Sequence, residues 1–176
     1  MKLSIEPSAS LLLTKLSNLL AAQGVQSYVV GGFVRDVLLG RGTADIDIAV
    51  TTDALETAHK VATALGGKYV PLDRINRIGR VILVNKRNPS TKSLWKVDLS
   101  TVKNTIEQDL ARRDFTIDAI AIDLSQLGKH YTEVPLIDPF NGWNDLRQGT
   151  IRTVTETVFE SDAARLLRAV RLAAGL

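Results

Sequence analysis

Apolar positions recur along the chain at two spacings, one typical of helices and one typical of short strands. Leucines at helical spacing predict a helix over about residues 8–24, which ends at Gly24. Further helices are expected over residues 33–39, 53–65, 105–113, 143–147 and 161–176. Runs rich in valine and isoleucine predict strands at residues 28–30, 45–50, 68–71, 80–84, 95–100, 117–123 and 151–154. This order predicts an α/β (α+β) fold in which helices flank a small mixed, mostly antiparallel sheet.

A double-glycine turn, Gly31-Gly32, joins the first predicted strand to the helix that follows it. Glycine permits a tight turn, and the free backbone N–H groups at the start of a helix favour an anion such as phosphate. Arg35 lies one helical turn further on and can reach that phosphate. It can equally pair with Asp36 or another acid as a structural brace, and the sequence leaves both roles open.

Two carboxylates, Asp45 and Asp47, stand at i and i+2 of the second predicted strand. They therefore project from one face, while Ile46 and Ile48 point the other way, into a core. A bare Asp-x-Asp is usually two exposed aspartates on an edge strand, but this pair follows the glycine turn by one helix and a short loop. Carboxylates suit divalent metals, so the combination indicates metal-dependent nucleotidyl transfer.

Asp98 is the natural candidate for a third carboxylate, on an adjacent strand. Its neighbours Val97 and Leu99 are expected to face the core, which would turn Asp98 toward the cleft that holds the aspartate pair. Two-metal phosphoryl chemistry usually needs such a third oxygen ligand, so we expect Asp98 to be catalytic together with Asp45 and Asp47.

Two charged blocks later in the chain carry weaker signals. Arg112, Arg113 and Asp114 stand at the end of a predicted helix, where they would often form only a solvated cap. Arginine forks also suit phosphates and sugar hydroxyls, so a binding role stays open.

The second block lies on the final predicted helix. Asp162 and Arg165 are i, i+3 neighbours there and can form a surface ion pair or offer an acceptor and donor set to the edge of a base. Arg168 and Arg171 extend this row as a basic stripe.

Composition narrows the class of protein. The 176 residues suffice for one domain, or for one domain and the start of another. The chain has no cysteine, which excludes disulfides and thiolate metal sites, and His59 and His130 lack metal-ligand spacing. No apolar run approaches membrane-spanning length and there is no signal-peptide pattern, so we expect a cytoplasmic protein without a membrane partner. The net charge of +3 is compatible with a nucleic-acid partner but does not indicate one.

Taken in order, these blocks make the chain resemble the catalytic head of class II tRNA nucleotidyltransferases, the CCA-adding enzymes, and of bacterial poly(A) polymerases. Both groups belong to the superfamily of DNA polymerase beta. The resemblance rests on residues 31–36 with 45–47, then on 112–119, 138–146, 151–154 and 162–171. It implies a polymerase beta-like head over residues 1–155, followed by the first helix of a neck over residues 156–176. The final predicted helix is rich in core-type residues where the chain ends, which suggests a piece of a longer protein, although Gly175 can simply cap it.

The resemblance also implies roles for individual residues. Asp45 and Asp47 would bind Mg²⁺, while Gly32 and Arg35, next to Gly31, would contact the triphosphate.

Further roles fall on the two later blocks. Arg113 with Asp114 would contact the ribose or the phosphates, and Asp162 with Arg165 would select C or A by imitating a Watson–Crick edge. Two more arginines on the final helix would support the triphosphate or the base-reading arginine, namely Arg168 and Arg171.

The implied reaction is the addition of CMP and AMP from CTP and ATP to the 3′ end of tRNA. Rivals within this class are CC-only, A-only and poly(A) addition. Rivals from other classes are a non-catalytic nucleotide- or RNA-binding head and a small-molecule nucleotidyltransferase. The chain departs from the usual family residues at Ser161 (Glu), at Ala163-Ala164 (Pro-Leu) and at Asp118 (Asn), which affects base preference rather than the metal chemistry.

Overall fold

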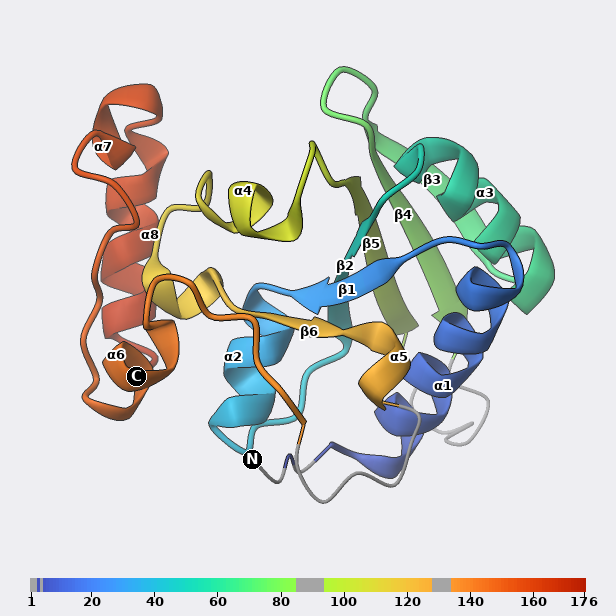
Figure 1. Ribbon diagram of the computed structural model, residues 1–176, viewed down its shortest axis with the longest axis horizontal. Helices are drawn as coiled ribbons and strands as arrows, with labels where there is room; N and C mark the ends of the chain where they lie inside the picture. Colours follow the sequence, from blue (N-terminus) through green and yellow to red (C-terminus); the bar gives the residue numbers. More distant parts are fainter. Residues whose placement is uncertain (1–2, 4, 85–93, 128–133) are drawn as a thin grey trace.

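The computed structural model describes residues 3, 5–84, 94–127 and 134–176, in which helices and strands are intermixed along the chain (Figure 1). The helices are α1 (Pro7–Ala22), α2 (Gly32–Leu38), α3 (Ala54–Leu65), α4 (Ile106–Leu110), α5 (Leu124–Leu127), α6 (Gly142–Arg147), α7 (Val158–Ser161) and α8 (Ala164–Ala173), with a 3₁₀ turn η1 (Thr116–Asp118). The strands are β1 (Ser27–Val30), β2 (Asp45–Val50), β3 (Lys68–Asp73), β4 (Ile78–Val84), β5 (Leu94–Thr101) and β6 (Ala121–Asp123). Within these ranges, no helix is long and apolar enough to cross a bilayer.

The strands form one six-stranded mixed sheet in the order β3-β4-β5-β2-β1-β6. β2 and β5 are parallel, and the other neighbouring pairs are antiparallel. The predicted mixed, mostly antiparallel sheet with flanking helices is therefore confirmed. β2 lies in the interior of the sheet, hydrogen-bonded on both edges, so the register that orients its side chains is closely defined.

The alternation of side chains along β2 separates a closed face of the sheet from an open one. Ile46 and Ile48 are buried in the main core, which apolar side chains of α1, α2, α3 and α5 complete. The intervening carboxylates of Asp45 and Asp47 project to the opposite face. There α4 covers only part of the sheet, in a smaller cluster that includes Ala49.

Helices α6, α7 and α8 lie together at one side of the molecule (Figure 1). Leu172 of α8 packs against Phe115, Ile117 and Leu146 in a third apolar cluster, and it is the buried residue of that helix. This cluster contains residues from both sides of the domain boundary expected at 155/156. The boundary itself stays a prediction.

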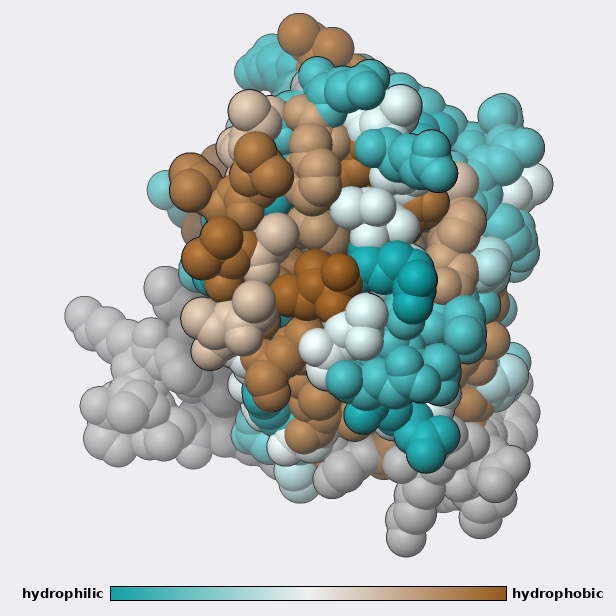
Figure 2. All heavy atoms as spheres, turned by 90° about the vertical axis from the view of Figure 1, so that its left-hand side faces the viewer, coloured by the Kyte–Doolittle hydropathy of each residue, from teal (hydrophilic) through white to brown (hydrophobic). Residues whose placement is uncertain are grey.

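The opposite side of α8 presents apolar side chains to solvent. Leu166, Leu167 and Val170 are 52%, 76% and 68% exposed. Figure 2 views the molecule from this side and shows hydrophobic side chains gathered on the surface. The core-type residues of the final helix are therefore only partly used by the fold.

Most predicted elements are confirmed with small shifts of their ends, but two strands were wrong. Residues 117–123 form η1 and then the short β6 rather than one strand, and residues 151–154 contribute only an isolated antiparallel bridge. Local hydrogen bonds form η1, from the N–H of Asp118 to the carbonyl of Phe115 and from the N–H of Ala119 to that of Thr116, both at 3.0 Å. Residues 152–154 stay outside the sheet because their backbone pairs directly with that of residues 114–116. This pairing satisfies polar backbone groups that would otherwise need a sheet partner. The predicted loop at residues 85–93 lies outside the described residues.

The predicted final helix is divided at Asp162. This residue has an extended backbone, with φ −161° and ψ 106°, between α7 and α8. Its carboxylate accepts a hydrogen bond from the backbone N–H of Ala164 at 2.9 Å and so caps the start of α8. The expectation that Asp162 and Arg165 share one face of a continuous helix was therefore wrong.

The close contact between Gly142 and η1 gives a test of this packing. A Cβ at residue 142 would collide with the backbone carbonyl of Thr116, so Gly142→Ala should lower the free energy of unfolding by about 2 kcal/mol or more. Urea unfolding followed by tryptophan fluorescence measures this change. Gly42→Ala is the matched control, because a Cβ there meets nothing within 4 Å. An equal loss in both variants would contradict the assigned packing.

Candidate active site on the open face of the sheet

Three aspartates lie together on the open face of the sheet. Asp45 and Asp47 occupy alternate positions of β2, and Asp98 of β5 stands directly opposite Asp47 in the parallel register. The prediction that Asp98 shares a face with the aspartate pair is confirmed, since Val97 and Leu99 are buried in the main core. Because β2 is an interior strand, the edge-strand interpretation of Asp-x-Asp does not apply here.

Two of these carboxylates are paired with basic side chains from neighbouring positions. Arg80 of β4 donates from Nε to Asp98 Oδ1 and from Nη2 to Asp98 Oδ2, both at 2.7 Å. This bidentate contact raises the pKa of Arg80, against a smaller effect of burial. Lys96 Nζ lies 3.3 Å from Asp45 Oδ1. The sequence analysis missed both Arg80 and Lys96. Side chains alternate between the two faces of a strand, so the positions of these residues on β4 and β5 would have placed them on the face of Asp98.

Asp47 differs from its neighbours, because no hydrogen bond or ion pair to its carboxylate is found among the described residues. The pKa of Asp47 is raised from 3.8 to about 6, and burial is the largest cause. Repulsion by Asp98 and Asp118 contributes to this rise, while Arg113 and Arg168 act in the opposite direction. The site thus holds a desolvated carboxylate whose negative charge is only partly compensated.

This arrangement fits a divalent cation between Asp45 and Asp47. A hard cation prefers carboxylate oxygens and would compensate the charge that burial disfavours on Asp47. Asp98 is engaged by Arg80, and in the described part of the chain no group of three acidic, histidine or cysteine side chains is arranged to hold a metal. The expectation that Asp98 adds a third ligand stays a prediction.

The glycine turn brings Asp47 close to Arg113. Gly31 has φ +67°, in the left-handed region that favours glycine. A Cβ at Gly31 would lie 2.6 Å from Arg113 Nη1 and 3.2 Å from Asp47 Oδ2. The absence of a side chain at Gly31 therefore lets an arginine and a carboxylate approach the same turn.

Arg35 is engaged by acids rather than free to meet a ligand. Its Nε and Nη2 donate to Asp36 Oδ1 at 3.0 and 2.9 Å, and its Nη1 donates to Asp118 Oδ1 at 2.5 Å. Burial alone would lower the pKa of Arg35, but Asp118 and Asp36 together raise it. The brace predicted as one of two roles is thus present, and a phosphate contact by Arg35 stays a prediction.

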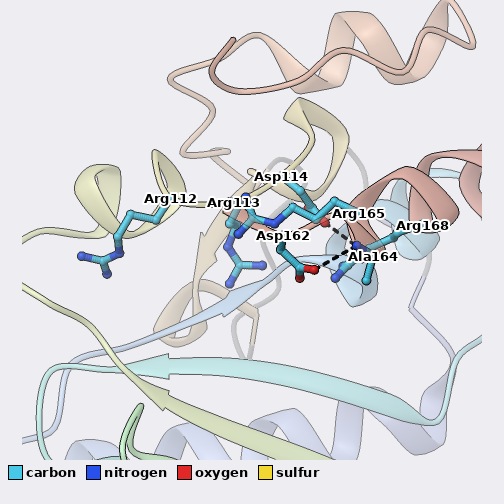
Figure 3. A pocket seen from close by; sticks show the side chains of 7 residues that line it. All are labelled: Arg112, Arg113, Asp114, Asp162, Ala164, Arg165 and Arg168. Atoms are coloured by element: carbon cyan, nitrogen blue, oxygen red, sulfur yellow. Dashed lines mark hydrogen bonds and ion pairs between the residues drawn. The ribbon is translucent and has the colours of Figure 1, made fainter. Parts of the chain in front are cut away.

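A pocket of about 370 Å³ is lined by Arg113, the arginine that lies next to the Gly31 turn (Figure 3). It is lined by Arg112, Arg113, Asp114, Asp162, Ala164, Arg165 and Arg168. Five of the predicted nucleotide-binding residues therefore meet in one place, although they come from two segments of the chain that lie nearly fifty residues apart in the sequence.

The arginines of this pocket differ in their partners. Arg168 lies 3.2 Å from Asp114 Oδ2 and 3.3 Å from Asp118 Oδ2, and Arg165 donates to the carbonyl of Val158 at 3.2 Å. Within the described residues, Arg113 Nε is buried and has no hydrogen-bond partner. Arg113 thus has a donor that no described protein group satisfies.

Three other predicted residues behave differently from expectation. Arg171 is exposed on α8 and does not line the pocket. Among the described residues, no ion pair joins Asp162 to Arg165, so the surface-pair interpretation does not hold either, and both remain candidates for contacting a base. Asp118, noted in the sequence only as a departure from a motif, links Arg35 to Arg168.

In a nucleotidyltransferase, carboxylates that suit a divalent cation are expected to lie next to a pocket that binds anions. The open face of this mixed sheet has such carboxylates beside an arginine-rich pocket. Comparison with known proteins then narrows this class to a family. The family model described as "Poly A polymerase head domain" matches residues 27–152, which is well over half of the chain. The chain belongs to this family.

The most similar relatives are tRNA nucleotidyltransferases of different specificities. A CC-adding tRNA nucleotidyltransferase of Synechocystis sp. is 39% identical over 86% of this chain and 33% of its own length. An A-adding enzyme of Halalkalibacterium halodurans is 38% identical over 91% of this chain and 38% of its own length. The Thermotoga maritima CCA-adding enzyme complexed with tRNA has a TM-score of 0.78 at 38% identity, over 96% of this chain and 38% of that one. The chain thus spans little more than a third of the length of these relatives.

The uncompensated charge on Asp47 predicts an unusual response to mutation. A pKa raised from 3.8 to about 6 means that the folded chain holds the Asp47 proton more tightly than the unfolded chain does, so ionising Asp47 costs stability as pH rises through that interval. In EDTA at pH 8, Asp47→Asn should therefore raise the free energy of unfolding by about 2 kcal/mol. At pH 4 the gain should fall below about 1 kcal/mol.

Asp98→Asn provides the control, because it leaves Arg80 without its bidentate partner. It should lower the free energy of unfolding at pH 8 by about 1 kcal/mol. Urea unfolding of both variants at the two pH values makes the comparison. A loss of stability in Asp47→Asn at pH 8 would contradict the assigned electrostatics.

Proposed function

We propose that this chain is the catalytic head of a tRNA nucleotidyltransferase that adds CMP and AMP from CTP and ATP to the 3′ end of tRNA, with release of pyrophosphate. The observation that carries the proposal is the position of Asp45 and Asp47 on the open face of β2, next to the Gly31 turn and Arg113. Family membership supports the nucleotidyltransferase class, and the CC-, A- and CCA-adding relatives support tRNA as the acceptor. The cytoplasmic location expected from the sequence stays a prediction.

In this proposal Asp45 and Asp47 would hold Mg²⁺, which would supply compensation for the charge of the triphosphate and a lower pKa for the primer hydroxyl. The primer 3′-hydroxyl attacks the α-phosphorus in line, a phosphodiester bond forms, and the bond to pyrophosphate breaks. No covalent enzyme intermediate is needed, so the protein contributes mainly positioning and compensation of charge. Arg113 donates to the phosphates or the ribose, and its Nε has no acceptor among the described residues.

The base would be read at the start of α8. Asp162 and Arg165 line the pocket beside Arg113, and they supply an acceptor and a donor set of the kind that reads base edges. Two solved relatives, both CCA-adding enzymes, are described as complexes with ATP and CTP, with TM-scores of 0.79 and 0.78. These nucleotides are therefore the ones we propose for this pocket.

The first test is nucleotide binding by the chain itself, followed by transfer. Calorimetry with Mg²⁺ should show binding of CTP and ATP in preference to GTP and UTP, and Asp45→Asn/Asp47→Asn should abolish the dependence of this binding on metal. Transfer of labelled CMP or AMP to tRNA that lacks its 3′ end is then measured. Equal binding of all four nucleotides would argue against CCA addition, and metal-independent binding would favour a non-catalytic head.

Arg113 and Arg112 offer a matched pair for the anion contact. Arg113→Ala should weaken nucleotide binding by about tenfold or more, because it removes the arginine beside Asp47 with a free donor. Arg112 is 49% exposed, pairs with Asp109, and is directed away from the other pocket residues in Figure 3. Arg112→Ala should therefore change affinity by less than about threefold. A reversed order in the titrations would contradict the assignment.

A further inference from the structure

Asp118 occupies an unusual position among the charged residues of the site. It lies in η1 with 1% of its surface exposed, so its charge is almost completely removed from water. Each carboxylate oxygen meets a different arginine, Oδ1 with Arg35 Nη1 at 2.5 Å and Oδ2 with Arg168 Nη2 at 3.3 Å. Its backbone carbonyl accepts a third contact, from Arg113 Nη1 at 3.3 Å. A buried carboxylate with such partners is stable only while they stay in place.

The three arginines belong to separate parts of the chain. Arg35 lies on α2 behind the glycine turn, Arg113 lies between α4 and η1 beside Asp47, and Arg168 lies on α8. One residue therefore connects the carboxylate end of the site to the helix that bears the base-facing side chains. Arg165 stands one turn before Arg168 on α8, so a shift of Arg168 would carry Arg165 with it.

The attachment of α8 makes this connection important. Leu172 is its buried residue, whereas Leu166, Leu167 and Val170 face solvent. Polar contacts supply much of the remaining attachment, because Arg168 binds Asp114 and Asp118, and Arg41 Nη1 donates to the carbonyl of Gly175 at 2.5 Å. A helix held mainly by a few directional contacts is displaced when one of them is removed.

We propose that Asp118 is a positioning residue that holds Arg168, and with it α8, at a fixed distance from Arg35 and Arg113, so that the base pocket keeps its shape. The expected consequence is discrimination between bases, and this consequence rests on the proposed function. The positioning role does not require Asp118 to touch the nucleotide. A carboxylate suits this role because it accepts from two guanidinium groups, whereas an asparagine has one acceptor oxygen and would turn an N–H group toward one arginine.

The chain offers a control that shares the chemistry but lies outside the pocket. Asp145 is 2% exposed and is bound by Thr116 at 2.7 Å and Arg152 at 3.0 Å. It is another buried aspartate held by an arginine, and it does not line the pocket. Asp145→Asn therefore reports the general cost of disturbing a buried ion pair in this part of the fold.

The first arm of the test needs no nucleotide. Hydrogen exchange of the full chain is measured for Asp118→Ala, Asp118→Asn and Asp145→Asn, with circular dichroism to verify folding. Amides of α8 should exchange about tenfold faster in Asp118→Ala, less so in Asp118→Asn, and unchanged in Asp145→Asn. If α8 exchange is unchanged in both Asp118 variants, the proposal is overturned. If Asp118→Ala does not fold, Asp118→Asn decides this arm.

The second arm measures dissociation constants for CTP, ATP, GTP and UTP by calorimetry with Mg²⁺. The preference for CTP and ATP should fall by about tenfold in Asp118→Ala and be kept in Asp145→Asn. Arg168→Met should cause a similar fall, and adding Asp118→Ala to it should cause little more, because both act through one contact. A preference retained in Asp118→Ala, or lost equally in Asp145→Asn, would contradict the proposal. Lack of any preference in the unchanged chain would instead remove the proposed function, while the exchange arm still decides whether Asp118 holds α8.

Discussion

The charge on Asp47 is the constraint on which the rest of the site depends. Its carboxylate lies on an interior strand where burial disfavours the ionised form, and no described residue pairs with it. Asp98, directly opposite, is paired with Arg80, and its charge still raises the pKa of Asp47 by repulsion. A fold selected for stability alone would place a neutral or paired side chain here. The uncompensated charge is understandable if the position is completed by a cation that arrives with the nucleotide.

The arginines near the site compensate the negative charge of Asp47 only in part, because none of those described pairs with it directly. Arg113 is brought near by the Gly31 turn, while Arg35 and Arg168 are occupied by Asp36, Asp114 and Asp118. Their acidic partners fix the guanidinium groups in place and leave donors of Arg113 available. The site therefore combines arginines that build the pocket with an arginine that can meet an anion. Sequence alone does not distinguish these two roles, because the residue type is the same in each.

Much of the fold follows from local rules. Alternation in β2 and helical spacing in α1 each depend on neighbours within a few residues, and the structure agrees with them. One failure occurred where a distant segment supplies the backbone partner. Residues 151–154 were predicted as a strand, but they pair with residues 114–116 outside the sheet. The error at Asp162 has a local cause, because its side chain accepts from the N–H of Ala164 and ends the helical periodicity there.

For this protein, the sequence by itself determined the chemical groups and their order: paired carboxylates on one strand face, a glycine turn before them, and two charged blocks after them. Periodicity and side-chain chemistry are local properties, and they can be read without coordinates. Only the tertiary structure decided which acids are paired and which are not, because Arg80, Lys96 and Asp118 meet their partners across strands or across 50 and more residues. Burial and distance set the pKa of Asp47 and the free donor of Arg113, and both quantities arise from packing between segments that the linear order keeps apart.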